Sequence, residues 1–221
     1  MPTANSCIRG CLPCCASGAA DNTVQPTNVN RPEVFENSDI VWCIDLDGTL
    51  IYEDVTTLAI KGVLREGSLQ KITRSLLHAF KGCLKSNLRP AQVFLETSFE
   101  VDVTRLTYNP TLLELIKTHR QRGGKVVLAT AADETAAKRV AEHLQGVFHE
   151  VIASDGDHIK RSRRKATALN ERFGKNNYIY AGNSSDDLNV WKDASAMLVV
   201  NTSKNVCREA LKMGKPYMVI K

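Results

Sequence analysis

No apolar run in the sequence approaches the roughly 20 residues of a membrane-spanning helix, and the N-terminus lacks the charged-then-apolar plan of a secretory signal. We therefore expect a cytoplasmic protein. Aromatic residues make up only 6% of the chain and the formal net charge is +5, so no nucleic-acid interface is indicated. The 5 histidines show no metal-ligand spacing, and serine-hydrolase, nucleotide-loop and zinc-protease motifs are absent.

The remaining composition, with 43% apolar and 24% charged residues, is that of an ordinary globular protein. A length of 221 residues accommodates one good-sized domain with an insertion or a tail. The mild basic excess is compatible with an anionic substrate or an anionic membrane surface.

The most informative stretch is an apolar run over residues 40–44 that ends abruptly in Asp45, Leu46, Asp47 and Gly48. Such a run is typical of a parallel strand buried on both faces. The two aspartates then lie at its carboxyl end, which is the edge where open α/β sheets bind ligands. The pattern predicts an α/β fold of parallel strands with a functional site at this edge.

Two carboxylates this close repel each other unless a cation or a shared proton lies between them, and oxygen ligands of this kind suit Mg²⁺. This points to phosphate chemistry. Asp45 can attack phosphorus, while Asp47 can protonate the leaving oxygen and later accept a proton from water. The alternatives are an aspartate-rich turn or a calcium loop, but the further ligands of a calcium loop are not at the required spacing.

Residues 1–38 carry few large apolar side chains and are predicted to form a flexible tail. Three interpretations of its clustered cysteines are open: a redox pair, a zinc site, or reversible S-acylation that tethers the protein to a membrane. We favour acylation, because the redox and zinc motifs lack their usual surroundings. The scattered Cys43, Cys83 and Cys207 are expected to be reduced. The cluster consists of Cys7, Cys11, Cys14 and Cys15.

Residues 52–108 are predicted to form a helical cap inserted after the first strand. Between Lys61 and Arg89 there are seven Lys or Arg and one acid, Glu66, while apolar residues recur every three to four positions. Such a segment usually exposes its charged face to solvent. The functional alternative is that some of these cations clamp an anionic substrate or rest on anionic lipid.

The catalytic core is predicted to comprise residues 39–51 and 109–221, because strands and helices alternate again from Asn109 onward. Asn109 and Asp133 are good N-caps and predict two helices. Further strands are predicted over residues 125–129, 148–152, 177–181, 197–200 and 217–220.

Polar residues follow the ends of several of these strands. Thr130 is either a hydroxyl donor for a phosphate oxygen or only the approach to a helix. Five of the seven residues from Ile159 to Lys165 are basic, and Lys165 is predicted to reach a phosphate near the helix N-terminus. Asn183 and Asp187 follow the strand over 177–181, and their side chains are candidates both for helix capping and for metal ligation.

These motifs resemble those of the haloacid dehalogenase-like phosphohydrolases, in which Asp-x-Asp-Gly-Thr, a threonine, a lysine and a final acidic motif follow successive strands. Over most of residues 40–201 the sequence is similar to the phosphoserine-phosphatase-like members, including the domain fused to UbiA-type prenyltransferases. The resemblance implies a Rossmann-like parallel sheet with a small cap. It also implies an aspartyl-phosphate on Asp45 and acid/base catalysis by Asp47.

Binding roles carry over to the matching positions. The implied phosphate-binding residues are Thr130, Ala131 and Lys165, and the implied Mg²⁺ ligands are Asp45, Asp47, Asn183 and Asp187. Asn183 departs from the family pattern, which has an aspartate here, so one negative charge is missing and metal affinity is expected to fall. Asp186 and Asp187 can supply the missing charge.

The sequence thus predicts a Mg²⁺-dependent phosphomonoesterase for a small phosphorylated substrate, with sugar phosphates and lipid-linked phosphates as candidates by analogy. One alternative is a membrane-recruited adaptor with little or no catalysis, which Asn183, the cysteine tail and the basic cap would suit. The other is a phosphotransferase, in which an acceptor other than water takes the phosphoryl group from Asp45.

Overall fold

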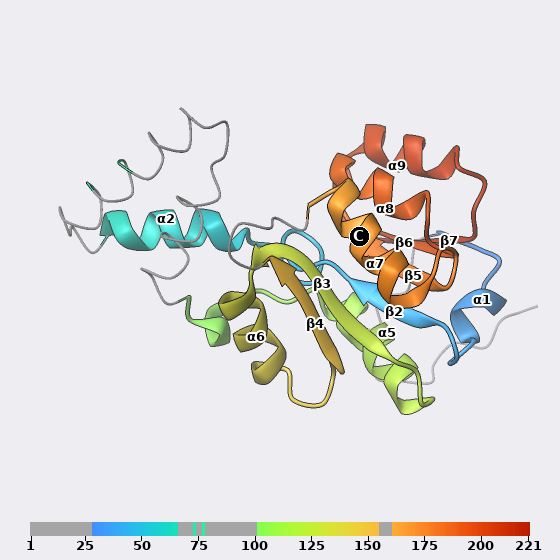
Figure 1. Cartoon of the computed structure of the whole chain (residues 1–221), viewed down its shortest axis with the longest axis horizontal. Helices are drawn as coiled ribbons and strands as arrows, with labels where there is room; N and C mark the ends of the chain where they lie inside the picture. Colours follow the sequence, from blue (N-terminus) through green and yellow to red (C-terminus); the bar gives the residue numbers. More distant parts are fainter. Residues whose placement is uncertain (1–27, 66–72, 74–76, 78–100, 155–160) are drawn as a thin grey trace, which may run out of the picture.

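The computed structural model describes residues 28–65, 73, 77, 101–154 and 161–221. This part of the chain contains one seven-stranded sheet in the order β1-β7-β6-β5-β2-β3-β4 (Figure 1). Neighbouring strands are parallel, except that β1 pairs antiparallel with β7. The strands are β1 Asn28–Asn30, β2 Val41–Ile44, β3 Val126–Asp133, β4 Glu150–Ser154, β5 Tyr178–Gly182, β6 Ala196–Val200 and β7 Tyr217–Ile220.

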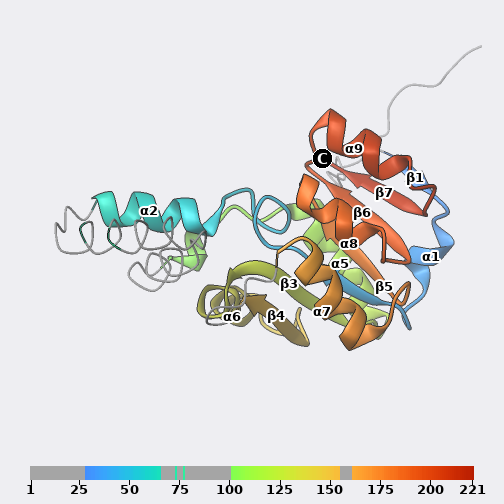
Figure 2. The same cartoon turned by 45° about the horizontal axis from the view of Figure 1, so that its top comes forward.

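Helices cover both faces of the sheet (Figure 2). Those described are α1 Glu33–Glu36, α2 Val55–Arg65, α5 Pro110–Gln121, α6 Glu134–His143, α7 Arg163–Phe173, α8 Leu188–Trp191 and α9 Lys204–Leu211, with 3-10 turns η1 Val103–Arg105 and η2 Ser185–Asp187. Trp42 and Ile44 of β2 pack in the apolar cluster shared with α5 and α6, and Cys43 packs in the cluster shared with α7, α8 and α9. β2 is therefore buried on both faces, as its apolar run predicts.

The predicted α/β class with a parallel sheet is confirmed. The two predicted N-caps are also present, since Asn109 Oδ1 accepts the Leu112 N–H at 3.0 Å and Asp133 Oδ1 accepts the Thr135 N–H at 3.0 Å. β3 is longer than predicted, because it continues past Ala129 with an irregular register against β4 before it reaches Asp133. This irregularity lies at the sheet edge where the polar residues gather.

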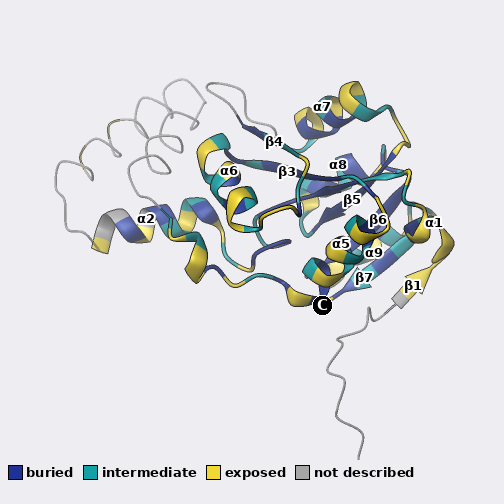
Figure 3. Cartoon of the chain, turned by 90° about the horizontal axis from the view of Figure 1, so that it is seen from below, coloured by how far each residue is buried: buried dark blue, intermediate teal, exposed yellow. Residues whose placement is uncertain are grey.

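Residues 28–38, which their composition assigns to the tail, instead belong to the folded core. β1 extends the sheet beyond β7, and Phe35 of α1 is buried edge-on against Trp42 with ring centroids 6.3 Å apart. The segment escapes sequence detection because a three-residue edge strand and a single helical turn show no apolar period. Val29 of β1 stays exposed at the edge of the sheet (Figure 3).

α2 follows the loop after β2 and extends away from the sheet (Figures 1 and 2). The segments entering and leaving the insertion are bonded together, because the Tyr52 N–H donates to the Thr107 carbonyl and the Asn109 N–H to the Leu50 carbonyl. Most of the predicted basic cap, like the cysteine cluster, lies outside the described residues. Among the residues that are described, no helix has both the length and the apolar character to cross a membrane.

Phe35→Ala should lower the free energy of unfolding by about 3–5 kcal/mol, because the lost ring leaves a cavity against Trp42. Urea denaturation of the full chain measures this change. Val29→Ala, at an exposed position of β1, is the control and should cost no more than about 0.5 kcal/mol. Equal losses from the two variants would place residues 28–38 outside the cooperative core.

Candidate active site

The ends of β2, β3 and β5 and the first turn of α7 surround a hollow of about 260 Å³. Apart from Ala131, its described lining residues are polar or charged. The charged ones are five aspartates and two cations: Asp45, Asp47, Asp54, Asp186 and Asp187, with Arg161 and Lys165. Asn183 also lines the hollow. Every predicted site residue except Thr130 therefore lies around it.

The loop after β2 sets the positions of the two predicted catalytic aspartates. The Asp45 N–H donates to the Ala181 carbonyl of β5 at 3.0 Å, so Asp45 is held where β2 leaves the sheet. Asp47 Oδ1 accepts the Val55 N–H at 2.8 Å, at the first residue of α2. The Asp47 side chain is therefore hydrogen-bonded to the start of the inserted segment, and the Asp45 backbone is hydrogen-bonded to the sheet.

Gly48 lies between this loop and the loop after β5. Its φ of +68° is in the left-handed region that glycine adopts without strain. A Cβ added there would stand 2.0 Å from Nδ2 of Asn183. Glycine therefore allows the turn without strain and leaves the space that the Asn183 amide occupies.

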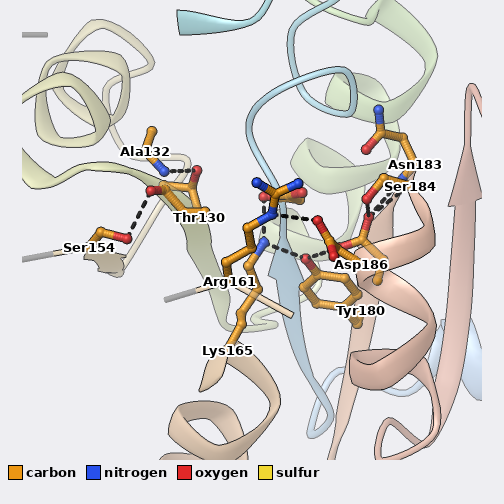
Figure 4. A network of polar contacts seen from close by, with 12 residues as sticks. Thr130, Ala132, Ser154, Arg161, Lys165, Tyr180, Asn183, Ser184 and Asp186 are labelled. Carbon is orange, nitrogen blue, oxygen red and sulfur yellow. Dashed lines mark hydrogen bonds and ion pairs between the residues drawn. The ribbon is translucent and has the colours of Figure 1, made fainter. Parts of the chain in front are cut away.

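Four buried polar side chains form a continuous chain of hydrogen bonds beside the hollow (Figure 4). Lys165 Nζ donates to Asp45 Oδ1 at 2.7 Å and to the Tyr180 hydroxyl at 2.8 Å. The Tyr180 hydroxyl in turn donates to Asp187 Oδ1 at 2.8 Å. Lys165 is 3% exposed and Asp45 8%, so this ion pair is largely removed from water.

Burial raises the pKa of Asp45 to about 6, against the opposing charge of Lys165. Burial also works to lower the pKa of Lys165, but the negative charges of Asp45 and Asp187 outweigh it, and that pKa is raised. The pKa of Tyr180 is raised well above its usual value, first by burial and then by Asp187. At neutral pH the site therefore contains a fixed ammonium, a carboxylate and a neutral phenol.

Asp187 holds the turn between β5 and η2. Its Oδ2 accepts the N–H groups of Asn183 and Ser184 at 3.0 and 2.8 Å and the Ser184 hydroxyl at 2.9 Å, while Oδ1 accepts from Tyr180. A Cβ on Gly182 would come within 2.6 Å of its Cγ. Three donors converge on Oδ2 and one on Oδ1, so Asp187 organises the loop in this structure, and its role as a metal ligand stays a prediction.

Thr130 is the one predicted site residue that does not line the hollow. It is fully buried, and its hydroxyl accepts the Ala132 N–H at 3.0 Å within the irregular end of β3. Ser154 of β4 supports the same bend by donating its hydroxyl to the Ala131 carbonyl at 2.8 Å (Figure 4). Ala131, in the irregular end of β3, lines the hollow. Phosphate binding by Thr130 stays a prediction.

Several lining or supporting residues are not among the site residues predicted from the sequence, and three of them make defined contacts. Asp54 lines the hollow and caps α2 by accepting the Thr57 N–H at 2.6 Å. Arg161 pairs through Nε with Asp186 at 2.5 Å at the edge of the hollow. Tyr180 is identifiable from the sequence, because a tyrosine inside an otherwise apolar buried strand needs a hydrogen-bond partner.

The donor set suits a hard divalent cation. Among the described residues, no group of three His, Cys, Asp or Glu side chains is arranged to hold a metal. Of the predicted ligands, Asp45, Asp47 and Asn183 line the hollow together, with no more than two carboxylates among them. This fits Mg²⁺, which commonly takes one or two carboxylates and completes its octahedron with water and substrate phosphate. Five negative and two positive side chains leave the hollow attractive to a cation.

A sequence model of the haloacid dehalogenase-like hydrolase family matches residues 43–192. The protein y4nM of Sinorhizobium fredii (strain NBRC 101917 / NGR234), described as uncharacterized, is 36% identical over 157 residues. That alignment covers 71% of this chain and 29% of the relative, so the chain spans less than a third of that protein's length.

Solved structures share the fold at low sequence identity. A predicted phosphatase from Clostridium acetobutylicum superposes with a TM-score of 0.58 at 17% identity, covering 84% of this chain and 94% of the other. A phosphoserine phosphatase carrying an analogue of its phospho-aspartyl intermediate superposes with a TM-score of 0.55 at 14% identity, covering 83% and 93%.

Gly48→Ala should destabilise the protein by about 1–2 kcal/mol more than Gly123→Ala. Both glycines have positive φ, at +68° and +88°, but only Gly48 has a neighbour that a Cβ would strike, namely Asn183. Thermal and urea unfolding measure the difference. Adding Asn183→Ala to Gly48→Ala should remove the excess, and an unchanged excess would contradict direct packing of the amide on Gly48.

Proposed function

Because this chain belongs to the haloacid dehalogenase-like hydrolase family, we propose that it hydrolyses phosphomonoesters through an aspartyl-phosphate on Asp45. The observation that carries this proposal is the buried pair of Asp45 and Lys165, which opens onto a polar hollow at the end of the central strand β2. A carboxylate fixed beside an ammonium is suited to attack a phosphoryl group while the ammonium compensates its charge.

In the first step the Asp45 carboxylate attacks phosphorus and the ester P–O bond breaks. Asp47 donates a proton to the leaving oxygen, so the product departs as a neutral hydroxyl. In the second step Asp47 accepts a proton from water, and the resulting hydroxide attacks phosphorus and releases inorganic phosphate with the Asp45 carboxylate. Lys165 remains protonated throughout and neutralises charge on the transferring phosphoryl oxygens.

We assign Asp45, Asp47 and Asn183 as the residues that would hold Mg²⁺, with Asp47 contributing its backbone carbonyl so that its carboxyl stays available for proton transfer. When bound, the ion supplies electrostatic stabilisation of the phosphoryl oxygens. Asp187 supports this set by fixing the loop that carries Asn183. Residues 39–51 and 109–221 would then act as the catalytic core and residues 52–108 as the cap.

The walls of the hollow favour a small hydrophilic leaving group. Arg161, Asp54 and three serines line it, Ala131 is its one apolar lining residue among those described, and its volume is about 260 Å³. An acyl or prenyl chain would bury little apolar surface against these described walls, so its binding would gain little hydrophobic stabilisation. We therefore place polar phosphomonoesters, such as phosphosugars and phosphoamino acids, ahead of lipid phosphates as substrates.

Asp45→Asn should lower the hydrolysis of p-nitrophenyl phosphate by at least about a thousandfold, because the amide cannot form the phosphorylated intermediate. Folding should persist, since an amide oxygen still accepts from Lys165. Release of nitrophenol and thermal unfolding are both measured. Asp39→Asn, at an exposed aspartate remote from the hollow, is the control, and turnover by Asp45→Asn within tenfold of that control would refute the assignment.

A panel of purified phosphomonoesters, assayed for released phosphate, tests the leaving-group proposal. The kcat/KM for phosphosugars or phosphoamino acids should exceed that for phosphatidic acid in mixed micelles by about tenfold or more, since the hollow offers little apolar contact. EDTA should abolish turnover and excess Mg²⁺ should restore it. A preference for the lipid substrate would overturn the proposal, and turnover that survives EDTA would overturn the metal assignment.

A further inference from the structure

Tyr180 lies at the centre of the buried hydrogen-bond chain, but the reaction outlined above gives it no part. It is fully buried in β5, and its backbone carbonyl accepts the Trp191 indole N–H at 3.0 Å. Its hydroxyl both accepts from Lys165 and donates to Asp187, each at 2.8 Å. The ring is fixed by the strand, so the hydroxyl occupies one defined position between the ammonium and the second carboxylate (Figure 4).

Three carboxylates act electrostatically on Lys165, those of Asp45, Asp187 and Asp47, and the first two are joined to it by the hydrogen-bond chain. It contacts Asp45 directly, whereas the negative charge of Asp187 acts on it from beyond the Tyr180 hydroxyl. A buried ammonium pairs directly with any carboxylate it can reach, because each unpaired donor is costly away from water. A direct ion pair between Lys165 and Asp187 would draw the ammonium away from Asp45 and from the hollow.

The hydroxyl prevents this competition by satisfying both groups at once. It gives Asp187 a donor in place of the ammonium and gives Lys165 an acceptor in place of the second carboxylate. The ammonium is then left with its short contact to Asp45 at 2.7 Å. A phenylalanine in the same place would fill the space but satisfy neither group.

We propose that Tyr180 is a positioning residue that keeps the Lys165 ammonium on Asp45 by separating it from Asp187. The catalytic consequence rests on the proposed phosphatase function, whereas the placement of the ammonium does not. Tyr180 itself contacts neither the reacting phosphorus nor the attacking oxygen; it acts through Lys165.

The chain offers a matched control two residues away. Tyr178 lies on the same strand, is also fully buried, and packs in the same apolar cluster as Tyr180. Its hydroxyl donates to Asn170 Oδ1 at 3.1 Å, away from the residues that line the hollow. Tyr178→Phe therefore removes one buried hydroxyl from β5 without touching the chain from Asp45 to Asp187.

Tyr180→Phe should lower kcat for p-nitrophenyl phosphate about tenfold or more, the size expected for one lost hydrogen bond to a charged group, while KM changes less than about threefold. Tyr178→Phe should leave both constants within about twofold of the unsubstituted protein. Similar kcat values for the two variants would overturn the proposal, as would an effect of Tyr180→Phe confined to KM.

A second readout is independent of catalysis. In ¹H–¹⁵N spectra of lysine ammonium groups, Lys165 should give a slowly exchanging signal, assigned by its loss in Lys165→Met, because its donors are buried and bonded. Tyr180→Phe should shift or broaden this signal and Tyr178→Phe should preserve it. If the protein shows no phosphatase activity, the proposed function fails, but the spectra still test whether Tyr180 positions the Lys165 ammonium. An unchanged signal in Tyr180→Phe would show that the hydroxyl does not position the ammonium.

Discussion

The structure depends on keeping one ammonium and one carboxylate charged together inside the protein. Lys165 and Asp45 are 120 positions apart in the sequence, and their contact brings α7 onto the end of β2. Removing the Asp45 side chain without an amide in its place would leave the Lys165 ammonium buried without an acceptor at this position, which is a strongly destabilising arrangement. The same ion pair that joins α7 to the end of β2 therefore also fixes the proposed nucleophile, Asp45, beside a cation that compensates its charge.

Sheet topology explains why the pair forms where it does. From β2 the chain builds β3 and β4 on one side, and then crosses to β5, β6 and β7 on the other. The chain consequently continues from β2 and from β5 toward opposite edges of the sheet, and this switch point is where open α/β sheets bind ligands. Asp45 is bonded to Ala181 at this switch point, and Asp187 holds the facing loop. The hollow follows from the strand order and not from any single motif.

The sequence predicted the central strands, their buried character and most of the residues that meet at the hollow, because abrupt changes from apolar to charged residues mark strand ends. It failed where the signal is not local. β1 has no apolar alternation, and nothing in the sequence reveals that β3 continues irregularly past Thr130, whose predicted phosphate-binding role stays a prediction. Arg161 was one of five neighbouring cations, and only the fold shows that it lies across from Asp186.

The Asn183 side chain packs against Gly48 and is also a proposed ligand for Mg²⁺. Its amide lies against Gly48, so the loops after β2 and β5 approach closely without adding a carboxylate next to Asp47. Asp187 already accepts from four donors, and Lys165 offsets one charge of Asp45. These contacts reduce the negative charge of the hollow but do not cancel it, because five aspartates face two cations, and the hollow still attracts a cation. In the proposed Mg²⁺ site the phosphate of the substrate would complete the ligand set, which would couple metal binding to substrate binding.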